Sequence, residues 1–220
     1  MERIEEAIEK KVEVMTPARE RKLGVYHVSD IVKCPRYVYL DFFSTKKNDL
    51  PDSIRRIFAI GHLIHEFIQE ALIENGVKKS DIEYKLLKDF VKDDIAIRIV
   101  GSIDVHLGDT IVEIKSSSRT GLEKVRDKHL EQANLYLGLQ DRGAKKAIIY
   151  RVCKDNLKSS TTEHLFDQEL FDKQVDWVFK LHQWLTNKKF PPYIPKKASC
   201  FMCGKRRECI EWQKQKKEHQ

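Results

Sequence analysis

The sequence predicts a mixed α/β fold. A long amphipathic helix at residues 53–76 is followed by three strand-like runs between residues 84 and 115. A further helix, two strands and a long helix follow within residues 125–187. This order of elements describes one mixed α/β core.

The helices before the first strand are predicted from apolar spacing and from proline. Residues 2–15 carry apolar side chains at helical intervals, as an amphipathic helix requires. Pro35 directly follows Cys34 and is expected at the first position of a second helix, where its missing N–H costs nothing. The helix at 53–76 is expected to bury an apolar stripe made of Ile57, Ile60, Ile64, Phe67, Ile68 and Leu72.

The strands are predicted from alternation and from a turn. Residues 95–107 alternate apolar with polar or small residues, which is typical of a strand with one buried face. Gly108-Asp109 is a hairpin signal, so the strands on either side of it should run antiparallel. The five predicted strands cover residues 84–91, 95–107, 110–115, 146–153 and 160–166, and the two helices that follow the third strand cover 125–140 and 170–187.

Composition limits the classes of protein that remain. The chain has 220 residues, of which 41% are hydrophobic and 34% charged, with a formal net charge of +7. The charges are interspersed, so the composition does not indicate disorder. The sequence pI of about 9.0 favours a polyanionic partner. The first residues lack the apolar segment of a secretion signal, and no stretch is apolar enough to cross a bilayer. We therefore expect a soluble, cytoplasmic protein.

Two carboxylates and a lysine gather around the predicted hairpin. Asp104 lies near the end of one strand, and Glu113 and Lys115 lie two apart on the next, so both of these project from one face. Carboxylates are the ligands that Mg²⁺ and Mn²⁺ prefer, and a nearby ammonium can stabilise charge that builds on a phosphate. The alternative is an ordinary turn and a solvated strand face, and this pattern alone does not separate the two.

Two further motifs lie on predicted helices. Gly61 and His65 are four apart in the helix at 53–76, and Gln132 and Tyr136 are four apart in the helix at 125–140. Residues at that spacing share a helix face. Each pair is weak evidence alone, because a single helical histidine is more often structural than a metal ligand.

Taken in order, these residues resemble the RecB-like branch of the PD-(D/E)XK nucleases. That family has a helical GxxxH, then GxxD, then (D/E)xK, then QxxxY. Here the four motifs read Gly61–His65, Gly101–Asp104, Glu113–Lys115 and Gln132–Tyr136. The resemblance implies a restriction-endonuclease-like core with a mixed central sheet flanked by helices.

The same resemblance implies roles for individual residues. His65, Asp104, Glu113 and the backbone carbonyl of Ile114 would hold Mn²⁺ or Mg²⁺. Lys115 would act on the attacking water or the scissile phosphate. Gln132 and Tyr136 would position DNA or the catalytic strand.

Five cysteines form the second constellation. Cys200, Cys203 and Cys209 lie within ten residues and offer three soft ligands, so a fourth is needed. Cys153 sits inside an apolar strand, where a cysteine is usually a small buried hydrophobe, so Cys34 is the expected fourth ligand. Four thiolates suit zinc or an iron–sulfur cluster, and the spacing does not decide between them.

One cysteine before the nuclease motifs and three after them is similar to the iron–sulfur RecB-like nucleases, and in a chain of this length to the stand-alone CRISPR-associated Cas-four family. That resemblance implies a 4Fe–4S cluster and a metal-dependent exonuclease that favours single-stranded DNA and attacks it from the 5′ end. It also implies prespacer trimming beside the CRISPR spacer integrase complex. A repair or viral recombination nuclease, and a zinc-stabilised DNA-binding adaptor without catalysis, are the alternatives.

The domain organisation expected from these motifs is a single RecB-like nuclease domain over residues 1–220. Within it, residues 1–50 are a helical part with the first cluster cysteine. Residues 53–190 are the nuclease core. Residues 191–220 are a basic tail that binds the cluster.

Overall fold

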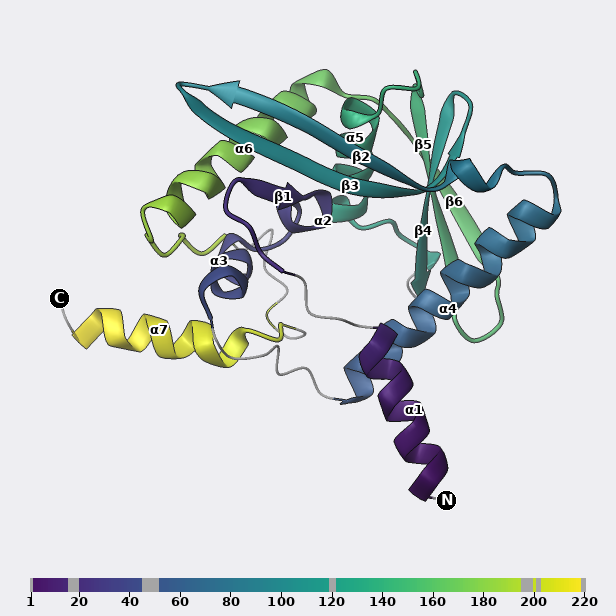
Figure 1. Ribbon diagram of the computed structural model, residues 1–220, viewed down its shortest axis with the longest axis horizontal. Helices are drawn as coiled ribbons and strands as arrows, with labels where there is room; N and C mark the ends of the chain where they lie inside the picture. Colours follow the sequence, from purple (N-terminus) through teal and green to yellow (C-terminus); the bar gives the residue numbers. More distant parts are fainter. Residues whose placement is uncertain are drawn as a thin grey trace. The chain divides into compact units, whose positions relative to one another are not determined.

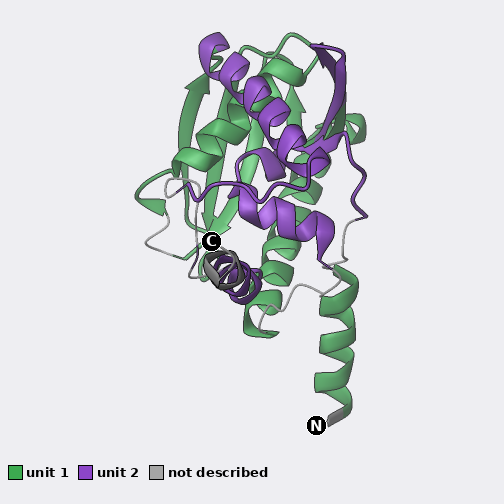
Figure 2. Cartoon of the chain, turned by 90° about the vertical axis from the view of Figure 1, so that its left-hand side faces the viewer, with its two compact units in different colours: residues 1–19, 51–86, 102–167 green, residues 20–50, 87–101, 168–220 purple. Residues whose placement is uncertain are grey.

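The chain divides into two compact units, each assembled from three separate segments (Figure 2). Unit 1 comprises Met1–Arg19, Pro51–Leu86 and Ser102–Asp167, and unit 2 comprises Glu20–Leu50, Leu87–Gly101 and Gln168–Gln220. The computed structural model describes residues 2–15, 20–44, 52–118, 122–194, 200 and 203–218. The expected N-terminal helical part, residues 1–50, and the expected basic tail, residues 191–220, lie partly outside these described residues.

The elements alternate as the sequence predicts (Figure 1). The helices are α1 (Glu2–Met15), α2 (Val28–Ile31), α3 (Pro35–Phe43), α4 (Asp52–Glu74), α5 (Asp127–Leu139), α6 (Gln168–Thr186) and α7 (Arg206–Glu218), with a short 3₁₀ turn η1 (Lys79–Asp81). The strands are β1 (Val25–His27), β2 (Ile82–Lys92), β3 (Ile95–Leu107), β4 (Thr110–Ser117), β5 (Lys146–Cys153) and β6 (Ser159–Leu165).

The strands form one mixed sheet. Their order is β1-β3-β4-β5-β6, with β2 also paired to β3. The β1–β3 and β4–β5 pairs are parallel, whereas β3–β4 and β5–β6 are antiparallel. The predicted turn after β3 is confirmed, since Leu107 pairs with Thr110 and Gly108 adopts a left-handed φ of 58°. The predicted α/β fold, a mixed central sheet flanked by helices, is therefore confirmed.

Helices cover both faces of the sheet in unit 1. Helix α4 packs against β4, and α5 packs against β5 and β6. A Cβ atom added at Gly61 of α4 would lie 3.1 Å from the Ser116 hydroxyl, whereas Lys115 donates a hydrogen bond to Gln132 of α5. Because neighbouring residues of a strand project from opposite faces, α4 and α5 lie on opposite sides of β4.

The core of unit 1 explains why the strands read as apolar runs. Ile103, Val105, Ile111, Ile114 and Ile149 are fully buried. Strands covered on both faces cannot alternate strictly between apolar and polar residues, which is the pattern of β4 and β5. Apart from Ile149, these buried apolar side chains lie on the same strands as the candidate catalytic carboxylates and surround them in sequence.

Unit 2 contains β1, the end of the β2–β3 ribbon that carries its turn, and the helices α2, α3, α6 and α7. Helix α2 packs against β1 and α6, and α3 packs against α6 and α7. Asp93 and Asp94 both have positive φ, at 49° and 61°, and so form the tight turn of the ribbon. The hydroxyl of the fully buried Tyr26 bonds to the His182 ring at 2.9 Å.

Two predictions about elements need correction. Of the stripe expected on α4, Ile64 is buried, but Ile57, Ile60 and Phe67 keep more than two fifths of their surface exposed. The inward face is instead the one that carries His65 and Gln69. Strand β1 and helix α7 were not predicted, because three residues give no periodicity and the last helix is almost wholly polar. No helix among the described residues has the length and apolarity needed to cross a bilayer.

Candidate functional site

Asp104 is fixed to β4 by its own side chain. The backbone ladder between β3 and β4 extends from Leu107 with Thr110 to Val105 with Val112. Beyond it, the backbone N–H of Ile114 donates to Asp104 Oδ2 at 2.6 Å. A side-chain oxygen thus takes the place of a ladder carbonyl, which holds this carboxylate against the strand that carries Glu113.

The two carboxylates are buried together at an electrostatic cost. Burial raises the pKa of Asp104 to about 6, and the Lys115 charge and the Ile114 N–H offset part of this rise. Burial and then the neighbouring Asp104 charge raise the pKa of Glu113 to about 7. In both cases the positive charge of Lys115 offsets only part of the cost of burying the ionised carboxylate.

One Glu113 oxygen has no partner in the part of the chain that the structure describes. Glu113 is 2% exposed, and its Oε2 is buried there without a hydrogen bond, although its Oε1 accepts from Lys115. A buried carboxylate oxygen left unsatisfied is costly, and a divalent cation is the partner that oxygen donors of this kind favour. The donor chemistry here therefore fits Mn²⁺ or Mg²⁺.

His65 approaches the carboxylates from α4. Its Nδ1 lies 3.7 Å from Asp104 Oδ2. Burial, and after it the Lys115 charge, lower the pKa of His65 to about 4, so the imidazole is neutral near pH 7 and keeps a lone pair for a metal. Gly61, one turn earlier, lets α4 come close enough to β4 for this approach, because a side chain there would press on Ser116.

Lys115 is held by residues of two elements. Its Nζ donates to Glu113 Oε1 on β4 and to Gln132 Oε1 on α5, the latter at 3.2 Å. Gln132 in turn donates from Nε2 to the Tyr136 hydroxyl at 3.1 Å. Burial alone would lower the pKa of Lys115, but the Glu113 and Asp104 charges outweigh it and the pKa is raised. Gln132 and Tyr136 are therefore placed to position the ammonium.

The structure adds residues that the motif analysis missed. Gln69 is buried and donates from Nε2 to Glu83 Oε1 at 3.0 Å and to the Asp104 carbonyl at 3.3 Å. Ser102 also donates to Glu83, at 2.6 Å. Gln69 lies four residues after His65, so helical spacing could have found it. Glu83 has no comparable signal in the sequence, because its backbone has a left-handed φ of 49° within β2, which interrupts the regular alternation of a strand.

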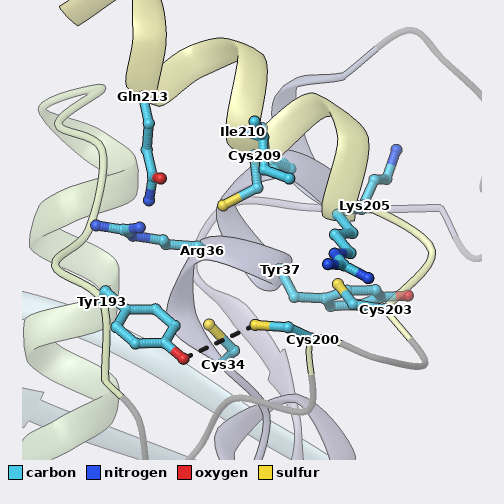
Figure 3. Close-up of a pocket in the computed structure, with 12 residues that line it drawn as sticks. Cys34, Arg36, Tyr37, Tyr193, Cys200, Cys203, Lys205, Cys209, Ile210 and Gln213 are labelled. Carbon is cyan, nitrogen blue, oxygen red and sulfur yellow. Dashed lines mark hydrogen bonds between the residues drawn. The ribbon is translucent and has the colours of Figure 1, made fainter. Parts of the chain in front are cut away.

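Four of the five cysteines line one cavity of about 320 Å³ in unit 2 (Figure 3). Cys34 is the residue before α3, Cys209 lies in α7, and the remaining two are Cys200 and Cys203. Cys153 is instead fully buried in β5 of unit 1, where its thiol lies 3.8 Å from Asp155 Oδ2. The structure thus brings together the four cysteines that the sequence predicts.

The cavity offers groups that would stabilise thiolates. Burial raises the pKa of Cys203 and of Cys209, but the Arg36 charge opposes this at Cys209. The Tyr193 hydroxyl lies 3.9 Å from Cys200 Sγ (Figure 3). Four soft sulfur donors around one cavity fit an iron–sulfur cluster or zinc. As the side chains stand, no three His, Cys, Asp or Glu residues among those described are grouped tightly enough to hold an ion.

Comparison with known proteins finds a similar fold in a solved structure. No known family model matches the sequence. No curated protein matches it. The crystal structure of SSO0001 is similar, with a TM-score of 0.62 and 22% identity over 92% of this chain and 94% of that one.

Two other solved structures have lower scores. An alkaline exonuclease from Laribacter hongkongensis has a TM-score of 0.47 and 14% identity over 76% of this chain and 93% of its own. A phage-related exonuclease from Haemophilus somnus 129PT has a TM-score of 0.42 and 16% identity over 73% and 82%. The likeness to SSO0001 concerns the fold alone. The chain therefore has a fold found, nearly end to end, in a solved protein.

Proposed function

We propose that this chain is a DNA exonuclease that depends on Mn²⁺ or Mg²⁺ and carries a 4Fe–4S cluster. The observation that carries the proposal is the buried pair Asp104 and Glu113 beside Lys115, with one Glu113 oxygen that accepts no hydrogen bond from the described residues. A structural ion pair would need no such free acceptor. The order of the four nuclease motifs around these residues supports the same activity.

The roles of the residues follow from their positions. His65, Asp104, Glu113 and the Ile114 carbonyl would hold the divalent ion. The ion would supply Lewis-acid polarisation of the scissile phosphate and of the attacking water. Lys115 would stabilise the extra negative charge on the phosphate as the water attacks. Gln132 and Tyr136 would keep the Lys115 ammonium in place, because they form the hydrogen-bonded chain behind it.

The substrate class follows from charge and from the family resemblance. A net charge of +7 favours binding to a polyanion such as DNA. The resemblance to the Cas-four family adds single-stranded DNA as the preferred substrate and attack from the 5′ end. It also adds a role in CRISPR prespacer processing with the spacer integrase complex.

The cysteine cavity would hold the cluster through Cys34, Cys200, Cys203 and Cys209. Cys34 stands before α3 and Cys209 stands in α7, so shared ligation would join these two helices of unit 2. We infer a structural rather than a catalytic role for the cluster, since metal-binding free energy also stabilises the fold.

The test is a cleavage assay on purified protein together with elemental analysis. Single-stranded oligonucleotides labelled at either end are incubated with Mn²⁺, Mg²⁺ or Ca²⁺. We expect shortening from the 5′ end with the first two ions, little with Ca²⁺, and iron with acid-labile sulfide. Protein that never shortens DNA and contains stoichiometric zinc without sulfide would instead be a DNA-binding adaptor. Co-purification with a spacer integrase would separate the CRISPR role from repair or viral recombination.

A further inference from the structure

A buried arginine near Lys115 has almost none of the partners that it needs. Arg151 lies on β5 and is 5% exposed. Its Nη2 donates to Thr162 Oγ1 at 3.1 Å, but Nε and Nη1 are buried without a hydrogen-bond partner among the described residues. None of the ion pairs among the described residues includes Arg151. A guanidinium that is buried without a counter-charge is strongly disfavoured, so its surroundings are incomplete without an anion.

Arg151 faces the same side of the sheet as the candidate catalytic lysine. In the parallel β4–β5 pair, Lys115 and Arg151 are register partners. Side chains at paired positions of adjacent strands project from the same face. Adjacent strands lie roughly 4.8 Å apart, so the two cationic side chains can face neighbouring parts of one sugar–phosphate backbone.

His129 completes this group from α5. It lies one helical turn before Gln132, so it shares the helix face that holds Lys115. Its Nδ1 is also buried without a partner. Burial lowers the pKa of His129 to about 3, with further lowering by the nearby charges of Lys115, Lys128, Arg126 and Arg151. A neutral imidazole can still donate one N–H to an anion.

We propose that Arg151 and His129 form a second phosphate-binding subsite, which takes a phosphate group of the DNA adjacent to the one acted on beside Lys115. The inference rests on the proposed nuclease function. It adds a contact that no motif residue supplies. A guanidinium presents pairs of parallel N–H donors to phosphate oxygens along its Nε–Nη2 and Nη1–Nη2 edges. Because Nη2 carries two N–H groups and Thr162 accepts one of them, one such edge remains available to an anion. Thr162 is a positioning residue, because it accepts one of the two N–H groups of Nη2 and so fixes the orientation of the guanidinium.

Two sources of phosphate share this chemistry. One is the internal phosphodiester next to the scissile bond, and the other is a terminal phosphate on the DNA end. An internal contact predicts sensitivity to the charge of one specific phosphodiester. A terminal contact predicts that phosphorylated ends are preferred over hydroxyl ends.

The experiment compares the wild-type protein with Arg151→Met and His129→Asn. The substrates are single-stranded oligonucleotides with a phosphorylated or hydroxyl 5′ end, each with or without one neutral methylphosphonate next to the scissile position. Binding is measured by fluorescence anisotropy without divalent metal, and cleavage with Mn²⁺. Arg142→Met is the matched control, because Arg142 is an arginine of the same unit that pairs with Asp81, a residue that has no role in the proposed site.

We expect Arg151→Met to weaken binding and to lower kcat/KM by about tenfold or more, chiefly through KM, the scale of a lost hydrogen bond to a charged group. The wild type should lose a similar factor on the methylphosphonate substrate or on the hydroxyl end. Arg151→Met should bind and cleave that altered substrate as well as it does the unaltered one, because the contact is already missing. His129→Asn should show a smaller loss of the same kind, and Arg142→Met none.

A structural role for Arg151 predicts a different result. Arg151→Met would then lower the melting temperature and remain as sensitive as wild type to every phosphate change, which would overturn the subsite. His129→Asn gives the same test if Arg151→Met does not fold. Binding is measured without cleavage, so an inactive protein would contradict the proposed nuclease function but leave the subsite testable.

Discussion

His65 Nδ1 on α4 lies 3.7 Å from Asp104 Oδ2 on β3, and that same oxygen accepts the Ile114 N–H of β4. Three elements therefore meet at one carboxylate oxygen. An imidazolium would be the usual partner at this distance, but burial lowers the pKa of His65 to about 4. The neutral ring leaves the negative charge of the carboxylates without compensation from this side, which is the electrostatic condition for a metal centre.

Asp104→Asn should abolish cleavage and preserve the fold. The amide keeps an oxygen for the Ile114 N–H but loses the charge that a divalent ion requires. We expect cleavage of single-stranded DNA to fall by about 100-fold or more, with DNA affinity retained. Asp94→Asn, at the exposed tip of the β2–β3 ribbon, is the control. Wild-type turnover by Asp104→Asn would refute this assignment.

Lys115→Met should lower turnover far more than substrate affinity. The Lys115 ammonium acts on charge that develops during the reaction, so kcat is expected to fall by about two powers of ten with little change in KM. Lys146→Met is a matched control, since Lys146 is a more exposed lysine whose partner on β6 is Glu163. Steady-state kinetics decide the question, and a raised KM with normal kcat would make Lys115 a simple phosphate contact.

Stability without divalent metal should fall as the pH rises. The pKa of Asp104 is raised from 3.8 to about 6 and that of Glu113 from 4.5 to about 7, so the folded state holds protons that the unfolded state has released. Such groups favour folding fully below the unfolded pKa values, and this contribution is lost as the pH passes through the folded ones. The loss should therefore accumulate between about pH 4 and pH 7.

Glu113→Gln tests whether Glu113 causes part of this loss of stability with rising pH. The amide cannot ionise, so the melting temperature of Glu113→Gln should change less than that of the wild type between about pH 5 and pH 8. Saturating Mn²⁺ should also flatten the wild-type curve, because binding to the folded state favours the ionised carboxylates. Identical slopes in thermal unfolding of the two proteins would show that Glu113 does not carry a raised pKa.

Cys34→Ser should remove the cluster, whereas Cys153→Ser should not. Cys34 lines the cavity with three other cysteines, and Cys153 is buried in β5. We expect Cys34→Ser to lose iron and sulfide. Its free energy of unfolding should fall by several kcal/mol, which is about half or less of the binding free energy of a structural metal site. Cys153→Ser should keep its iron. A colourless Cys153→Ser beside a brown Cys34→Ser would show that Cys153, and not Cys34, is the fourth ligand.

The sequence alone predicted most of the elements in their order, and it supplied the motif residues and cysteines that the two proposed sites use. Hairpin signals and alternation predicted β3, and the bounds Ile95–Leu107 are confirmed. Local patterns suffice here because periodicity and turn chemistry depend on neighbouring residues. The same holds for the cysteines, since Cys153 in an apolar run and Cys34 before Pro35 have different local surroundings.

Tertiary structure decided which surfaces face inward and which charges are left uncompensated. The apolar stripe of α4 predicted a buried Phe67, yet the inward face carries His65 and Gln69, because Gly61 lets that face approach β4. The unpartnered Arg151 could not be predicted either. Its isolation depends on which strand lies beside β4 and in which register, and no local pattern of residues encodes a parallel pairing between segments that are far apart in the chain.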